Sequence, residues 1–178
     1  YRHRCQHRFR YGRRRSMSEV ELLQGLSGEE IAEIEAEITH LPDRESAAID
    51  ALMIVQKHRG WVSDTSLQAI ARLLGMSADA LDSIATFYNL IFRQPVGRHV
   101  VMVCDSVSCY VMGADGLGKA IQEHLGIAFG ETTDDDRFTL LPIVCLGACD
   151  KAPTMMIDDE LIENVAAERL GEIFGRFE

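Results

Sequence analysis

Apolar side chains recur with two different periods along the chain. Between residues 27 and 92 they return every third or fourth position, which predicts a series of amphipathic helices. The predicted helices run from Ser27 to Pro42 and over about 44–59, 64–74 and 78–89. Ser27 followed by Glu30 is the signature of a capping box, in which each side chain satisfies a free backbone N–H of the first turn. This half is therefore predicted to fold as a helical bundle.

Each predicted helix has one apolar stripe that would face a shared core. The stripes consist of Ile31, Ile34 and Ile38; Ala48, Leu52 and Val55; Leu67, Ile70 and Leu74; and Leu81, Ile84 and Ala85. Phe87, Tyr88 and Phe92 end the fourth helix and are expected in the core, with a surface for a partner as the alternative. Trp61 is expected to pack in the bundle rather than meet a cofactor.

After Pro95 the pattern changes to short, continuous apolar runs. RHVVMVC, residues 98–104, predicts a strand that is covered on both faces. The other expected elements are a helix over 115–126, strands over 137–145 and 154–159, and a final helix over 165–177. Pro142 cannot donate a ladder hydrogen bond, so the second strand must lie at a sheet edge or end there. This order makes a small α/β layer, and the fold class is α/β (α+β).

Charge is distributed unevenly along the chain. The net charge is −10, but residues 1–16 contain seven arginines and no acidic residue, so the remainder has 11 basic against 28 acidic side chains. This acidity argues against a nucleic-acid partner, and Asp79 and Asp82 stand where a DNA-reading helix would need basic or amide groups. No apolar run approaches the ~20 residues that span a bilayer, so direct membrane insertion is not expected.

The chain is expected to have three parts. Residues 1–16 are interpreted as a disordered basic tail, a leader or added sequence ahead of Met17. Residues 17–94 form the helical bundle, and residues 95–178 form the α/β domain. Because no secretory signal is recognised, a reducing compartment is expected, where grouped thiols favour metal over disulfides.

Four of the five cysteines lie in the α/β half, in two close pairs. They are Cys104, Cys109, Cys145 and Cys149, with the spacing C-x4-C, then 35 residues, then C-x3-C. Each pair begins where a predicted strand ends. Loops that leave neighbouring strands at one sheet edge would bring the two pairs face to face.

The spacing leaves three occupants open: a [2Fe–2S] cluster, a zinc ion, or no metal at all. Zinc accepts four thiolates on short loops, whereas a two-iron cluster takes two thiolates per iron and tolerates longer loops. The residues between the cysteines are mostly small, so backbone N–H groups can approach the sulfurs, which favours the cluster. A C-x-x-C redox pair is absent, and the glycines of GADGLG, residues 113–118, do not follow the order of a dinucleotide-binding loop.

Several segments together resemble a known family. CDSVSC (104–109), CLGACDKAP (145–153), MMID (155–158), TFYNLIFRQPVGRHV (86–100) and IVQKHRGWV (54–62) are similar to the small [2Fe–2S] subunit in the NADH-oxidising arm of respiratory complex I. This is the NuoE-type, or 24-kilodalton-type, subunit. The resemblance covers about residues 27–178 and has no counterpart for the tail.

The resemblance implies a helical bundle followed by a thioredoxin-like ferredoxin domain. It also implies that Cys104 and Cys109 bind one iron, and that Cys145 and Cys149 bind the other. FMN and NADH would be bound by a partner subunit, because NADH releases two electrons together whereas a [2Fe–2S] cluster accepts one. No residue of this chain is expected to be catalytic by itself.

The function implied by the resemblance is one-electron transfer within NADH:quinone oxidoreductase. The implied partners are the flavin- and NADH-binding subunit and a larger iron–sulfur subunit. The implied location is the peripheral arm on the cytoplasmic side of a bacterial inner membrane, or the mitochondrial matrix in a eukaryote. The alternatives are an equivalent subunit of an NAD-dependent formate dehydrogenase or NAD-reducing hydrogenase, and a zinc-stabilised interaction module without a redox role.

Overall fold

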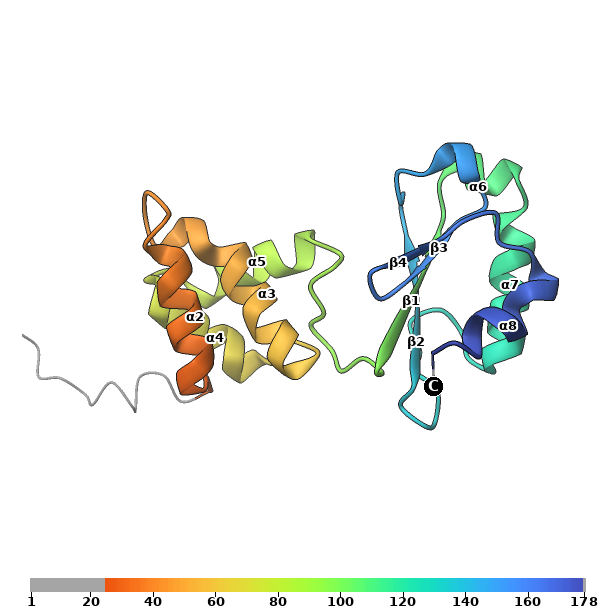
Figure 1. Ribbon diagram of the computed structural model, residues 1–178. Coiled ribbons are helices and arrows are strands. Elements are labelled where there is room, and N and C mark those ends of the chain that lie inside the picture. Colours follow the sequence, from red (N-terminus) through yellow and green to blue (C-terminus); the bar gives the residue numbers. More distant parts are fainter. Residues whose placement is uncertain (1–24, 178) are drawn as a thin grey trace, which may run out of the picture.

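A computed structural model describes residues 25–177, which form a helical bundle followed by a four-stranded sheet with its own helices (Figure 1). The predicted tail, residues 1–16, lies outside the described residues. The boundary at residues 94 and 95 falls in the segment that joins the two parts, and it remains a prediction. None of the helices within residues 25–177 has both the length and the apolar character needed to cross a membrane.

Serine caps define the starts of three bundle helices. The bundle contains α2 (Gly28–Ile38), the 3-10 helix η1 (Glu45–Ala47), α3 (Ala48–Arg59), α4 (Asp64–Leu74) and α5 (Ala78–Phe87). The Ser27 side chain accepts the Glu30 N–H and the Glu30 carboxylate accepts the Ser27 N–H, so the predicted capping box is confirmed. Ser63 and Ser77 cap α4 and α5. The first helix ends sooner than predicted, and the start of the second is a 3-10 turn.

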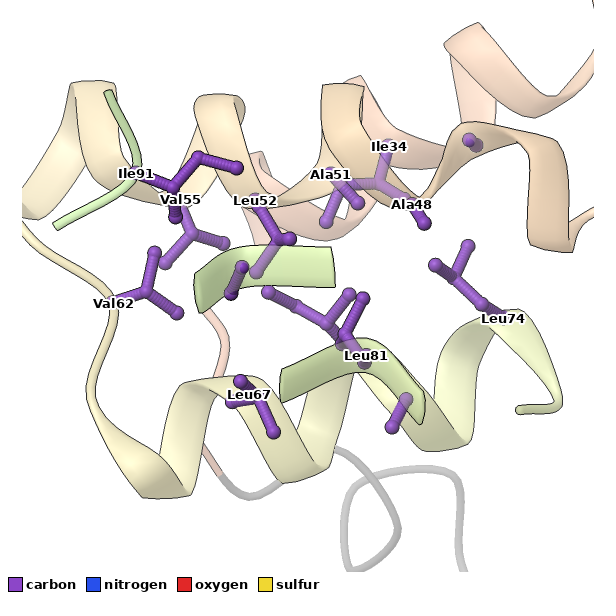
Figure 2. Packing of buried hydrophobic residues seen from close by; sticks show 14 residues of the cluster. Ile34, Ala48, Ala51, Leu52, Val55, Val62, Leu67, Leu74, Leu81 and Ile91 are labelled. Carbon is purple, nitrogen blue, oxygen red and sulfur yellow. The ribbon is translucent and has the colours of Figure 1, made fainter. Parts of the chain in front are cut away.

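The predicted apolar stripes meet in one core, as Figure 2 shows for residues such as Ile34, Leu52 and Leu81. Of the twelve stripe residues, Ile31, Ile38 and Ile84 are only partly buried, and the others are buried. The expectation of core positions was wrong for Phe87 and Tyr88, which are 80% and 42% exposed. Helix α5 ends at Phe87, and the following turn brings Ile91 rather than the aromatic pair into the core.

The second half is a sheet with the strand order β2-β1-β3-β4. Its strands are β1 (His99–Cys104), β2 (Phe138–Ile143), β3 (Met155–Ile157) and β4 (Glu160–Ile162). β1 and β2 are parallel, whereas β3 is antiparallel to both of its neighbours. β2 lies at the edge and contains Pro142, in agreement with the prediction from its missing N–H.

Both faces of β1 are covered, as its unbroken apolar run predicted. Helices α7 (Ala114–Leu125) and α8 (Leu170–Phe174) lie over the face that includes Val101 and Val103 (Figure 1). On the opposite face, Val100 and Met102 pack with Phe92, which belongs to the segment that joins the bundle to the sheet. The joining segment therefore contributes to the core of the sheet.

Several short elements differ from the predictions. Helix α6 (Val107–Val111) lies within the first cysteine loop, and β4 was not predicted. The 3-10 helix η2 (Cys149–Lys151) closes the second cysteine loop. The final helix is shorter than predicted, since residues 167–169 form the 3-10 helix η3 (Ala167–Arg169) before α8.

Candidate metal centre

The two cysteine loops leave one edge of the sheet. Cys104 is the last residue of β1, and Cys145 follows the end of β2 by two residues. The two strands are parallel and Cys104 is in register with Ile143, whose carbonyl accepts the Asp105 N–H at 2.8 Å. The carboxyl ends of parallel strands meet at the same edge, so both loops begin side by side. This is the placement that the sequence predicted.

Cys104 and Cys109 form the buried half of the site. They are 3% and 1% exposed and belong to a small cluster with Ala114 and Ala152. Helix α6 supplies Cys109 and reverses the chain directly after β1. The Cys109 sulfur lies 3.6 Å from the hydroxyl oxygen of Thr154, which precedes β3.

Backbone N–H groups surround the Cys104 sulfur. Burial by itself would raise the pKa of the Cys104 thiol, yet the pKa is lowered, because hydrogen bonds from the Ser106 and Leu146 backbone, from Cys109 and from Thr154 stabilise the thiolate. Leu146 belongs to the second cysteine loop. Its N–H therefore joins the two loops at the first cysteine.

Cys145 and Cys149 form the exposed half of the site. The Gly147 N–H donates to the Cys145 sulfur over 3.3 Å, and Gly147 has a φ of +77°. A left-handed residue at this point turns the loop back so that its N–H meets the sulfur, and glycine adopts that conformation without a steric penalty. Cys149 begins η2.

The donor set fits a thiolate-bound, anionic group. All four cysteines of the described region are free thiols, and within residues 25–177 no three or more His, Cys, Asp or Glu side chains form a group that could hold a metal ion. Two pairs of thiols, each accompanied by N–H donors, match a cluster that takes two thiolates per iron.

Lys151, which lies in η2 with Cys149, has an acidic partner nearby. The Lys151 ammonium lies 4.0 Å from the Glu163 carboxylate, and both side chains are about half exposed.

Thr154 is a part of the site that the sequence did not predict, because a single threonine after a proline carries no distinguishing pattern. Only the pairing of β3 with β1 brings it to the cysteines.

Comparisons with known proteins agree with this geometry. Residues 34–178 match the thioredoxin-like [2Fe-2S] ferredoxin family. The E subunit of NADH-quinone oxidoreductase from Pseudomonas aeruginosa is 48% identical over 161 residues, which cover 88% of this chain and 97% of that protein. The protein of the same name from Escherichia coli strain K12 is 49% identical over 152 residues, covering 85% and 92%.

A solved structure supports the fold alone. The NAD+-reducing [NiFe]-hydrogenase matches with a TM-score of 0.61 and 21% identity, over 71% of this chain and 22% of the hydrogenase chain. The family match and the extent of the curated relatives confirm the resemblance found in the sequence. The chain belongs to the thioredoxin-like [2Fe–2S] ferredoxin family, and within it to the NuoE-type subunits of NADH-quinone oxidoreductase.

Proposed function

We propose that Cys104 and Cys109 bind one iron of a [2Fe–2S] cluster and that Cys145 and Cys149 bind the other. The chain is an electron-transfer subunit of the NADH-quinone oxidoreductase type. The observation that carries the ligand assignment is that the two cysteine loops begin side by side, where Cys104 is in register with Ile143 and the Asp105 N–H donates to the Ile143 carbonyl at 2.8 Å. The zinc-stabilised module has no comparable support.

The bound cluster supplies one-electron chemistry, and the residues of the chain determine where that chemistry happens. Burial of Cys104 and Cys109 keeps water from one side of the site. N–H donors from Ser106, Leu146 and Gly147 offset the negative charge of the thiolates. Exposed Cys145 and Cys149 leave the other side open to an electron-transfer partner.

The partner on that side is proposed to be a flavin-bearing subunit that oxidises NADH. A flavin accepts a hydride and passes electrons on singly, which a [2Fe–2S] cluster requires. A larger iron–sulfur subunit completes the assembly. The proposed location of this chain is the peripheral arm on the cytoplasmic side of a bacterial inner membrane, or the mitochondrial matrix if the source is eukaryotic.

The test uses the purified full chain and its absorption spectrum before and after dithionite. We expect the visible bands of a [2Fe–2S] centre, their bleaching on reduction, and one EPR signal from the reduced protein. Cys104→Ala and Cys145→Ala should each lose most of the iron and the signal. Cys5→Ser is the matched control, since Cys5 lies in the basic tail and outside both pairs, and it should keep the full spectrum.

Metal analysis decides between the proposal and its zinc alternative. About two iron atoms per chain, with the spectrum of one cluster, support the assignment. A colourless protein that carries one zinc ion per chain would refute it. Loss of the spectrum in Cys5→Ser, together with its retention in Cys145→Ala, would show that the ligand assignment is wrong.

A further inference from the structure

Thr154 is a buried polar residue that the cysteine pattern does not explain. It is 1% exposed and directly precedes β3. Its carbonyl accepts the Cys104 N–H at 3.2 Å, and the next residue, Met155, is in register with Val103 of β1. These backbone contacts hold Thr154 beside the end of β1, and burial restricts its side chain.

The hydroxyl of Thr154 faces sulfur. Its oxygen lies 3.6 Å from the Cys109 sulfur, which is within the usual range for a hydrogen bond to sulfur. In the free protein either atom of the Thr154–Cys109 pair can donate. A cysteine that binds a metal is a thiolate without a proton, so the hydroxyl must then be the donor.

We propose that Thr154 is a positioning residue that donates a hydrogen bond to the Cys109 thiolate and thereby raises the reduction potential of the bound centre. This inference rests on the proposed ligand set. Reduction adds one electron and one negative charge without making or breaking a bond. A donor next to the sulfur stabilises the more negative state more than the less negative one, and the effect is large where water is excluded.

The effect of Thr154 on the reduction potential is expected to depend on its hydroxyl group. Thr154→Val keeps the branched shape and removes the donor, whereas Thr154→Ser keeps the donor and removes a methyl group. We expect Thr154→Val to lower the equilibrium constant for one-electron reduction about tenfold, which is ~59 mV for a one-electron couple. Thr154→Ser should remain within about twofold of the wild type, because its hydroxyl can reach the same sulfur.

Thr139→Val is the matched control. Thr139 is also buried, at 3% exposure, and its hydroxyl accepts the Gly97 N–H and contacts the Thr132 hydroxyl. It lies near the start of β2, and the cysteine loop follows the other end of that strand. Its loss should therefore affect stability without changing the potential.

The experiment is an EPR-monitored redox titration of the full chain and the three variants. A wild-type potential that Thr154→Val lowers and Thr154→Ser preserves supports the inference. An unchanged potential in Thr154→Val, or an equal shift in Thr154→Ser or Thr139→Val, overturns it. Thr154→Ala provides the same comparison if the valine variant folds poorly. Absence of any cluster signal in the wild type would instead refute the proposed function, so the two failures are distinguishable.

Discussion

The buried ion pair between Glu30 and Arg59 provides a quantitative test of how the bundle is stabilised. Glu30 is 1% exposed, and its two carboxylate oxygens accept from Nε and Nη2 of Arg59, each at 2.5 Å. The same carboxylate closes the capping box by accepting the Ser27 N–H at 2.6 Å. One side chain therefore joins the start of α2 to the end of α3.

Glu30→Gln removes the charge and nearly keeps the shape. Removing one partner of a buried ion pair costs about 3–5 kcal/mol, because the other charge remains buried and unpaired. The Arg59 side chain is 34% exposed, so water can solvate part of its charge, and glutamine can still accept one hydrogen bond. We therefore expect Glu30→Gln to lower the free energy of unfolding by about 2–3 kcal/mol.

The pH dependence of this contribution has a definite sign. Burial by itself would raise the pKa of Glu30, but hydrogen bonds from Arg59 and Ser27 and the charge of Arg59 hold the pKa below its ordinary value of 4.5. The unfolded chain binds the proton more readily than the folded protein. The stabilisation is therefore complete above pH 4.5 and is lost as the pH falls through the lower value of the folded state.

Urea unfolding followed by tryptophan fluorescence measures this effect. Trp61 is the only tryptophan of the sequence and lies between α3 and α4, so its emission reports on the bundle. The difference between wild type and Glu30→Gln should be constant from pH 7 to about pH 5.5 and should shrink below about pH 4.5.

An exposed pair between α2 and the residue before η1 is the matched control. Glu35 lies 2.5 Å from Arg44, but both side chains are nearly half exposed. Glu35→Gln should therefore cost less than about 1 kcal/mol. Equal costs for Glu30→Gln and Glu35→Gln, or a difference that does not change with pH, would show that burial does not determine the strength of these pairs.

Two further substitutions test the core and the second cysteine loop. Leu81→Ala should lower the free energy of unfolding by about 2–5 kcal/mol, because Leu81 of α5 is fully buried in the core that α3, α4 and α5 share. A loss below about 1 kcal/mol in the Trp61 fluorescence assay would contradict this packing. Gly147→Ala should accelerate iron loss to a chelator, because a side chain at a φ of +77° costs about 1–2 kcal/mol and displaces the N–H that meets Cys145. Gly116→Ala, in the first turn of α7 with open space around it, is the control and should release iron at the wild-type rate.

The sequence predicted the helices of the bundle well because their signals are local. Caps such as Ser27 with Glu30 involve residues three positions apart, and the apolar stripes need only the helical period. Local signals were insufficient for Phe87 and Tyr88. Their exposure depends on where α5 ends and on Ile91, which fills the core instead.

The placement of the two cysteine loops was also predicted from the sequence, though less completely. Two pairs of thiols, each after an apolar strand, predicted loops that meet at one sheet edge. Helix α6 was not predicted, because its five residues are too few to establish a helical period. The antiparallel direction of β3 was not predicted either, since the short run MMI does not specify its partner.

The amino-acid pattern was therefore enough to predict the fold class, a helical bundle followed by a thioredoxin-like domain, and the family, since both depend on residue types at short separations. Folding decided which neighbours the thiols have. Thr154 and Cys109 are 45 positions apart, and they meet because β3 pairs with β1. Contacts of this kind arise from the packing of strands and helices against one another, which no short stretch of the chain specifies.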